Sequence, residues 1–523
     1  MTERPGTDPH PAPVLRRIVS GMLAGWLQAA VGVVVSVVQV RLVFTHLDPD
    51  LTGAWFLFLT LAGYVALFDL GISPTLSRQV SFALGEADEG ESRQKIADLV
   101  ATTVRIFGWI SAGVLAVSIV AGLWFLSDVV PPVHRQPVRA AWAVFAVGAA
   151  LSVFGNTGFA ALNGLGRVGT ERTVRAAVQL AHLGLMYAAL ATGTGLLGLS
   201  MAFVANGLLL SGSGWVVLER TCPWLRGLRG SSAGILRAHA LASGRWALTA
   251  LGSVLILGTD NLVIARVMGA AAIPPYELVA KLTAMSMFVA SQLVTSAAPF
   301  VSVAQARGDE AGIRRLMLRT VRYGMAVMMG LSAGILVFAE PFIRFWVGPG
   351  HFVGFSVVAV FVAMMSLEAH HRFHATISMA MGRVVFHWWA LGSGVLNLVL
   401  TLVLIRSHGL LGVALGSLLA QLVTNNWFVP FYTLRLLGLS IARYVVSVAL
   451  PLVVLFGAAA GAGFAVRAVM PPGTPLLAQL SAGAGAVLTT SAVVFYALLA
   501  DEPERREIGH RIQRALHPRN ARA

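Results

Sequence analysis

The feature that most constrains this chain is a series of apolar runs about twenty residues long, two of which lie at 22–40 and 445–466. A helix of that length is about 30 Å long, which matches the hydrocarbon core of a bilayer. A transmembrane barrel would instead show segments of about ten residues in which polar and apolar residues alternate. We therefore expect a membrane protein built from helices, and the pattern excludes a transmembrane barrel.

The composition agrees with a membrane location. Hydrophobic residues make up 57% of the 523-residue chain and charged residues only 12%, with a mean hydropathy of +0.77. Soluble proteins contain about 25% charged residues, so a water-soluble core of this size could not hide so much apolar surface. Glycine is abundant, at 54 residues, and helices tolerate it in a membrane because neighbouring helices satisfy the backbone.

The apolar runs predict an all-α polytopic membrane protein with about fourteen transmembrane helices. The expected spans are 20–44, 52–73, 102–127, 140–162, 174–193, 196–218, 247–268, 277–303, 321–343, 353–380, 384–405, 410–433, 444–466 and 476–499. The first run follows Arg16 and Arg17 and is far longer than the core of a signal peptide. We interpret it as a retained first helix.

The positive charge follows the predicted topology. The net charge is +15, and most of the 38 Lys and Arg fall in alternate loops, which would all face one side. Positively charged loops remain in the cytoplasm, so we expect a multi-pass protein of the cell (cytoplasmic) membrane with both termini cytoplasmic. The charge thus indicates topology, and no nucleic acid is expected as a partner. The lone Cys222 cannot form an intramolecular disulfide, and no redox role is expected.

Internal similarity indicates two related halves, as in many transporters. Matched positions recur in the same order at offsets of 221, 216 and 214 residues, in the pairs Trp55 and Tyr276, Gly166 and Gly382, and Gly195 and Gly409. Each half would hold six helices, so the two lobes run parallel. We expect a cytoplasmic N-terminal tail at 1–19, a six-helix lobe at 20–219, a basic cytoplasmic linker at 220–240, a second six-helix lobe at 241–433, two additional helices at 434–500 and a basic cytoplasmic tail at 501–523.

Four stretches carry a resemblance to a known family. They are Leu47–Trp55, Ala66–Ile72 with Leu76–Arg78, Asp260–Arg266, and Glu340–Trp346 with Gly348. These stretches resemble the oligosaccharide/polysaccharide flippase family of the multidrug/oligosaccharidyl-lipid/polysaccharide exporter superfamily, and each lies in the corresponding predicted helix. The resemblance extends to the number of spans and to the arrangement of six plus six helices, so it covers nearly the whole chain.

The resemblance implies a function and partners. Members of this family move a polyprenyl-diphosphate-linked oligosaccharide from the cytoplasmic to the outer leaflet by alternating access of two lobes. It therefore implies a lipid-linked oligosaccharide as substrate, membrane lipids as surroundings, and glycosyltransferases and a polymerase of one surface polysaccharide pathway as further partners. Transport of this kind involves no catalytic chemistry, so we expect neither enzyme activity nor a cofactor.

The densest group of ionisable residues inside an apolar run lies on the predicted tenth helix and comprises Glu368, His370, His371, Arg372 and His374. Such residues cost a few kcal/mol at membrane depth, so each needs a partner, a wet cavity or a role. Glu368, His371 and Arg372 share one helical face, which we expect to line a cavity and offer cationic donors to a diphosphate. The alternative is an Arg372–Glu368 ion pair that only stabilises packing. His370 and His374 have the spacing of a metal pair, but no third ligand is evident and no metal is expected.

Four further residues are candidates. Asp260 and Lys281 lie on predicted helices joined by a short loop, so they could form a gate or coupling site, or a static pair. Asp69 matches an aspartate of the family, but its place near the membrane surface also allows a structural role. Arg41 at the end of the first helix is either a snorkelling residue or part of a cationic cavity, since related flippases use basic residues of that helix.

Three other functions compete with the flippase. A cation-coupled multidrug antiporter of the same superfamily would be expected to concentrate acidic residues in its cavity. A membrane polysaccharide polymerase or glycosyltransferase generally needs a sizeable outer loop, whereas every predicted outer loop here is short. A non-transporting scaffold would tolerate neutralisation of its intramembrane charges. No phosphate-binding loop or nucleophile elbow is present in the sequence.

The topology can be tested with reporter fusions. Reporters placed near Gly230 and Gly308 should report the cytoplasm, whereas reporters near Pro131, Gly269 and Gly348 should report the outside. A cytoplasmic signal at Gly269 would contradict the parallel arrangement of the two halves, because it would shift the second half by one helix.

Overall fold

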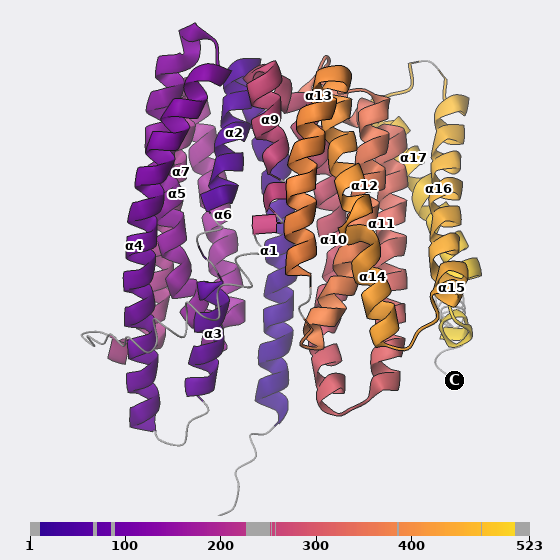
Figure 1. Cartoon of the computed structure of the whole chain (residues 1–523), viewed down its shortest axis with the longest axis horizontal. Helices are drawn as coiled ribbons and strands as arrows, with labels where there is room; N and C mark the ends of the chain where they lie inside the picture. Colours follow the sequence, from indigo (N-terminus) through magenta and orange to yellow (C-terminus); the bar gives the residue numbers. More distant parts are fainter. Residues whose placement is uncertain are drawn as a thin grey trace, which may run out of the picture. The chain divides into compact units, whose positions relative to one another are not determined.

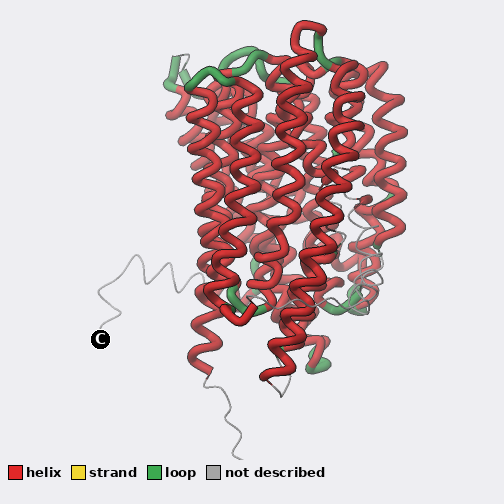
Figure 2. Tube along the Cα trace, turned by 90° about the vertical axis from the view of Figure 1, so that its left-hand side faces the viewer, coloured by secondary structure: helices red, strands yellow, loops and turns green. Residues whose placement is uncertain are grey.

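Helices are the regular elements throughout the part of the chain that the structure, a computed structural model, describes (Figures 1 and 2). The described residues are 11–65, 69, 71–84, 89–225, 251–252, 254–256, 258–383, 386–471 and 473–507. Most of the predicted basic linker and tail therefore lie outside them. The chain forms two compact units, Met1–Pro274 and Pro275–Ala523, which we treat one at a time. The predicted linker at 220–240 stays a sequence-based prediction.

The first unit contains long helices and several short ones. Its elements are α1 (Pro11–His46), α2 (Pro49–Val65), α3 (Ile72–Ala83), α4 (Glu89–Val129), η2 (Pro132–His134), α5 (Arg135–Gly164), α6 (Val168–Ala191), α7 (Gly195–Thr221), η3 (Pro223–Leu225), α9 (Thr259–Met268) and η4 (Ala270–Ala272). The predicted span at 52–73 is shorter than expected, because α2 ends at Val65 and α3 follows only after Gly71, whose φ is 74°. Glycine adopts this left-handed conformation without steric cost.

The second unit begins within α10. Its elements are α10 (Ile273–Ala306), α11 (Glu310–Val347), α12 (Phe355–Ala380), α13 (His387–Val423), α14 (Asn425–Leu436), α15 (Ile441–Tyr444), the π-helical turn η5 (Val445–Ala449), α16 (Leu450–Val469), α17 (Leu476–Val494) and the π-helical turn η6 (Phe495–Leu499). The two predicted spans at 384–405 and 410–433 are joined in α13, which is kinked at Gly409. A short helical turn at 502–507 ends the described chain.

The helices have the length and surface of membrane spans. Ten of those in the described ranges are long and apolar enough to cross a bilayer, and every one of the predicted spans overlaps a described helix. Large apolar side chains face outward, including Trp109 and Trp124 on α4, which are 81% and 76% exposed. In water such exposure would be costly, whereas lipid solvates it. The prediction of an all-α polytopic membrane protein is confirmed.

Glycines bring α5 and α7 of the first unit into close contact. A Cβ atom on Gly148 would lie 2.8 Å from the backbone nitrogen of Val204, and one on Gly158 would lie 2.9 Å from the backbone of Gly214. Helices in a membrane associate through such small residues, because packing rather than the hydrophobic effect holds them together. This pair of helices therefore forms the rigid centre of the first unit.

The structure repeats the predicted correspondence between the two halves. Gly166 after α5 and Gly382 after α12 both have positive φ, 72° and 79°. Each follows the same capping pattern, in which the next residue, Arg167 or Arg383, donates its N–H to a carbonyl five residues back, of Leu162 or Ser378. Such a reversal with glycine is a common helix end. The two glycines therefore terminate equivalent helices in the same way.

A buried aromatic pair is repeated as well. Trp55 packs edge-on against Phe145, with ring centroids 5.7 Å apart, and Tyr276 packs edge-on against Phe361 at 4.8 Å. Phe145 and Phe361 occupy positions 216 residues apart, the same offset as the two glycines. Edge-to-face rings are favoured by their quadrupoles. Because this pairing is independent of the backbone caps, it supports a common architecture for both halves.

The last two long helices, α16 and α17, pack on each other and on α11. Small residues allow the close approach, with Ala333 and Val337 of α11 buried against Ala459 and Ala460 of α16. On α17, a Cβ atom on Gly483 would lie 1.9 Å from the ring of Phe338. We refer to α16 and α17 together as the C-terminal hairpin. Its contacts within the described part of the second unit make α11 its main support.

This packing can be tested with a pair of glycine substitutions on one helix. Gly483→Ala should destabilise the protein by about 1–3 kcal/mol, because the buried Phe338 ring must move to admit the methyl group. Gly485→Ala is the matched control, since a Cβ atom there meets nothing within 4 Å. Thermal unfolding of the detergent-solubilised variants measures both effects. Equal stability of the two variants would show that α17 does not pack on α11 through Gly483.

Candidate functional site

The predicted charged face of α12 contains one ion pair within its own helix. The Nε of Arg372 donates to Oε1 of Glu368 at 2.7 Å. The two side chains differ in exposure, since Arg372 is 43% exposed and Glu368 only 9%. The other carboxylate oxygen, Oε2 of Glu368, has no hydrogen-bond partner within the described ranges. A buried carboxylate thus holds a guanidinium whose outer half remains accessible.

Two of the predicted histidines bind α12 to the end of α15, which precedes the C-terminal hairpin. The ring Nε2 of His370 is hydrogen-bonded to the hydroxyl of Tyr444 at 2.8 Å. The ring of His374 is fully buried, and its Nδ1 donates to the carbonyl oxygen of His370 at 2.9 Å. The His374 and Tyr444 rings also pack edge-on, with centroids 5.6 Å apart. These two histidines therefore face the interior of the second unit.

His371 contacts the point where α13 ends and α14 begins. Its Nδ1 donates to the backbone carbonyl oxygen of Asn425 at 3.1 Å, next to a break at Thr424 with φ −114° and ψ −78°. The side chains of Gln421, Asn425 and Asn426 are buried there, each with amide atoms that lack a hydrogen-bond partner among the described residues. Buried amides without partners are costly. The second unit therefore has a polar interior where α12 packs on α13 and α14.

The remaining predicted site residues are scattered over several elements. Asp260 is buried in the first turn of α9, and Lys281 on α10 has its Nζ 3.8 Å from Oε2 of Glu277 on the same helix. These residues belong to different units, so an Asp260–Lys281 pair stays a prediction. Asp69 is half-buried and accepts the backbone N–H of Ser73 at 2.9 Å, which caps the first turn of α3. Arg41 is exposed on α1.

The structure also shows a charged cluster in the first unit that the sequence reasoning missed. Glu171 in the first turn of α6 is only 2% exposed and forms ion pairs with Arg172 and Arg175. Arg175 also donates to Oδ1 of Asn156 on α5 at 3.3 Å. The predicted span that corresponds to α6 begins at residue 174, so Glu171 and Arg172 fall in the loop before it. The available signal was the i, i+4 spacing of Glu171 and Arg175.

This cluster and the pair on α12 share one matched position of the repeat, although their glutamate–arginine pairs lie on helices that are not equivalent. Asn156 and Arg372 lie 216 residues apart, the offset that relates the glycine caps and the aromatic pairs. In each unit, a nearly buried glutamate forms an i, i+4 pair with an arginine, Glu171 with Arg175 and Glu368 with Arg372. The matched position itself is Asn156 in the first half and Arg372 in the second, and Asn156 accepts from the guanidinium of Arg175, which comes from the next helix, α6.

A cavity of about 530 Å³ lies beside the cluster in the first unit. It is lined by Ala24 of α1 and by the turn into α6, through Leu165, Gly166, Arg167, Gly169, Thr170, Thr173 and Val174. Arg172 donates to Oε1 of Gln28 at 3.2 Å and so links α6 to α1 one turn from Ala24. The polar residues of its lining are Arg167, Thr170 and Thr173, and the rest of the lining is apolar or glycine.

Comparison with known proteins gives matches of two kinds. A family model described as "Polysaccharide biosynthesis protein" matches residues 94–351. The "Uncharacterized membrane protein EpsK" of Bacillus subtilis (strain 168) is 22% identical over 255 residues, which are 46% of this chain and 48% of that protein. The chain thus spans about half the length of this curated relative.

Solved structures match over much more of the chain. "Lipid II flippase MurJ, inward closed conformation" has a TM-score of 0.68 and 12% identity, covering 92% of this chain and 99% of that one. A multidrug resistance MATE family transporter of the MOP superfamily in its inward-facing conformation has a TM-score of 0.62 and 14% identity, covering 77% and 94%. At such identities the likeness shows the fold.

The sequence match and the structural match are independent of each other. One rests on residues 94–351 and the other on the arrangement of helices along nearly the whole chain. The chain is therefore similar in sequence, over residues 94–351, to a family described as polysaccharide biosynthesis protein, and in fold to a lipid II flippase and to a MATE transporter of the MOP superfamily, and both matches bear out the predicted resemblance.

Proposed function

We propose that this protein is a flippase that moves a polyprenyl-diphosphate-linked oligosaccharide across the cytoplasmic membrane by alternating access, for surface polysaccharide biosynthesis. The family model described as polysaccharide biosynthesis protein and the fold shared with a lipid II flippase support this proposal. Both termini would lie in the cytoplasm, as the distribution of arginine predicts. Glycosyltransferases would supply the substrate, and a polymerase would use it on the outer side.

Arg372 is the observation that carries the proposal. A diphosphate that leaves water needs cationic donors, and a guanidinium presents several in a planar fork. In Arg372, Nε is bound by Glu368, while the terminal nitrogens have no hydrogen-bond partner within the described ranges. Glu368 would thus orient the guanidinium, and its outer edge would receive the diphosphate. His371, the neighbouring residue, would add a second donor when it is protonated.

The other predicted residues enter the mechanism in supporting roles. Lys281 on α10 and Arg41 on α1 are further cations for the substrate, and Asp260 and Asp69 are candidates for coupling or gating. His370 and His374 would act mainly by fixing α12 against Tyr444, because their rings are already engaged there. Fixing α12 in this way would keep Arg372 in place beside Glu368. An arginine side chain that is already held loses less conformational freedom when it binds substrate than a mobile one does.

A cation-coupled drug antiporter is the second candidate function. The fold is shared with multidrug resistance MATE family transporters, and Asp260 is a buried carboxylate. An antiporter of this kind would bind cationic drugs, for which the arginine-bearing face of α12 is electrostatically unsuited. Resistance to cationic drugs that depends on Asp260 and survives loss of Arg372 would favour the antiporter.

Loss of the protein tests the flippase function directly. A deletion strain without a redundant flippase should retain the lipid-linked oligosaccharide in the inner leaflet and lose the surface polymer. Leaflet-specific labelling of the sugar measures the first effect, and surface polysaccharide staining measures the second. Normal labelling from the outside in that strain would contradict the proposal.

Substitutions on α12 test the role of Arg372. Arg372→Ala should abolish translocation in proteoliposomes at normal amounts of folded protein, and Arg372→Lys should restore it only in part, because the ammonium keeps the charge but lacks the fork. Glu368→Gln should be milder, since the cation remains. Arg314→Ala is the matched control, because Arg314 forms a similar i, i+4 pair with Glu310 and is 42% exposed.

A purely structural pair would behave differently. Removing either partner would then leave the other charge stranded, so Arg372→Ala and Glu368→Ala should lower the unfolding temperature alike, and the double substitution should partly restore it. Translocation would follow the amount of folded protein. Full translocation by Arg372→Ala would remove this arginine from the mechanism and leave Arg41 and Lys281 as the candidate cations.

A further inference from the structure

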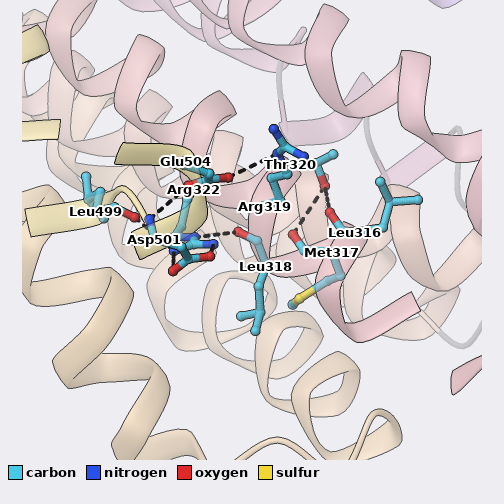
Figure 3. Close-up of polar contacts among 9 residues, drawn as sticks. All are labelled: Leu316, Met317, Leu318, Arg319, Thr320, Arg322, Leu499, Asp501 and Glu504. Atoms are coloured by element: carbon cyan, nitrogen blue, oxygen red, sulfur yellow. Dashed lines mark hydrogen bonds and ion pairs between the residues drawn. The ribbon is translucent and has the colours of Figure 1, made fainter. Parts of the chain in front are cut away.

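The chain that follows α17 turns back onto α11 in the second unit. Asp501 follows the π-helical turn η6 after one residue, Ala500, and the helical turn at 502–507 comes next. Figure 3 shows the polar contacts between this region and residues 316–322 of α11. We call residues Asp501–Glu507 the strap. Neither the C-terminal hairpin nor the strap belongs to the repeated halves, so their contacts with α11 need their own explanation.

The first contact is a bidentate ion pair between Arg322 and Asp501. Arg322 donates from Nη1 to Oδ1 of Asp501 at 2.6 Å and from Nη2 to Oδ2 at 2.5 Å. The same Nη1 also donates to the backbone carbonyl oxygen of Leu499 at 2.8 Å. The Arg322 side chain is 11% exposed, and its guanidinium holds the pKa of the Asp501 carboxyl below the ordinary value of 3.8. This carboxylate is therefore charged at neutral pH.

A second ion pair lies one turn away. The Nε of Arg319 is 3.0 Å from Oε1 of Glu504, whose side chain is only 9% exposed. The other oxygen, Oε2, accepts the backbone N–H of Asp501 at 3.0 Å. Glu504 thus closes the first turn of the strap and binds α11 at the same time. In each pair one partner is largely buried and the other, Asp501 or Arg319, is 56% exposed, and the bond from the Asp501 N–H to Glu504 joins the two pairs into a network, unlike isolated surface pairs, which contribute little.

The strap also completes the end of α17. The last carbonyl groups of a helix lack partners within that helix. Here the carbonyl of Leu499 is bound by Arg322, and that of Ala497 accepts from Nη2 of Arg505 at 2.6 Å. Both carbonyls lie in the π-helical turn η6. Arginines near a helix C-terminus are favoured by the helix dipole, so these contacts stabilise a turn that is otherwise irregular.

The hairpin is also fastened to α11 near its opposite end. Arg467 near the end of α16 donates from Nη1 to the carbonyl oxygen of Val337 at 3.0 Å and from Nη2 to Oε2 of Glu340 at 3.3 Å. Between the two fastenings lies the close approach of Gly330 on α11 to Ser491 on α17, where a Cβ atom on the glycine would lie 3.0 Å from the serine Oγ. Polar contacts at both ends and small residues between them leave α16 and α17 little freedom to move away from α11.

We propose that the strap is a conformational device that locks the end of α17 to α11, so that the C-terminal hairpin is carried by α11 as one body. Because Tyr444, the last residue of α15, is hydrogen-bonded to His370 of α12 and leads through η5 directly into α16, this body would also steady the charged face of α12. The lock is made by Arg322 and Arg319 on one side and by Asp501 and Glu504 on the other. It does not depend on which substrate the protein carries.

Hydrogen exchange of the full-length protein in lipid nanodiscs tests the lock without any substrate. Asp501→Asn and Glu504→Gln should each speed amide exchange at residues 495–505 by about tenfold, a factor that corresponds to about 1.4 kcal/mol of opening free energy. Glu502→Gln is the matched control, because the Glu502–Arg506 pair lies in the same strap but is 81% and 75% exposed and does not contact α11. Arg322→Lys should give an intermediate rate.

The outcomes distinguish a lock from contacts that do not restrain the end of α17. Faster exchange confined to the end of α17 in the Asp501 and Glu504 variants, with the Glu502 variant unchanged, would support the proposal. Exchange in the Asp501→Asn, Glu504→Gln double variant equal to that in Glu502→Gln would overturn it. If the double variant does not fold, the single variants and Arg322→Lys decide the question, and a failure of translocation has no bearing on it.

Discussion

Lipid cannot satisfy the hydrogen bonds of a polypeptide backbone, and the rest of this structure depends on that constraint. It requires helices for the spans, and it makes every departure from a helix need a partner. The break between α2 and α3 has Asp69 to accept the N–H of Ser73, and the end of α17 has Arg322 and Arg505 to bind two carbonyl oxygens. Polar side chains thus occur where regular backbone pairing ends.

The same constraint explains why the two halves resemble each other in caps and packing more than in composition. A helix that ends near the membrane surface needs a compact reversal, and Gly166 and Gly382 supply it with the same positive φ and the same hydrogen bonds. The aromatic pairs, Trp55 with Phe145 and Tyr276 with Phe361, lie in the first halves of α5 and α12, far from the caps. The two halves therefore share local geometry toward both ends of the same helix.

Much of the fold could be predicted from the sequence, because each membrane span needs about twenty apolar residues. The hydropathy of the sequence shows directly where runs of that length lie. The start of α6 was missed, because Glu171 and Arg175 read as loop charges until their mutual pairing is seen. The strap could not be found, since Arg322 and Asp501 are 179 residues apart and no local pattern connects them. On α12, spacing correctly paired Arg372 with Glu368, but it could not show that His370 is bonded to Tyr444 from another helix.

The paired charges of the two halves suggest why each arginine keeps a glutamate beside it. A buried ion pair is weak evidence for stability, because the cost of removing both charges from water offsets their attraction. An apolar residue at Glu171 or Glu368 would pack at lower cost, so a stability argument alone does not explain either carboxylate. A carboxylate one turn away does, however, keep a guanidinium charged and oriented within an apolar surrounding. Glu368 leaves the outer edge of Arg372 accessible, whereas the cluster around Glu171 binds Arg175 further to Asn156. The two pairs therefore use the same i, i+4 spacing on helices that are not equivalent in the repeat, and of the two arginines Arg372 is the one held by its glutamate alone among these contacts.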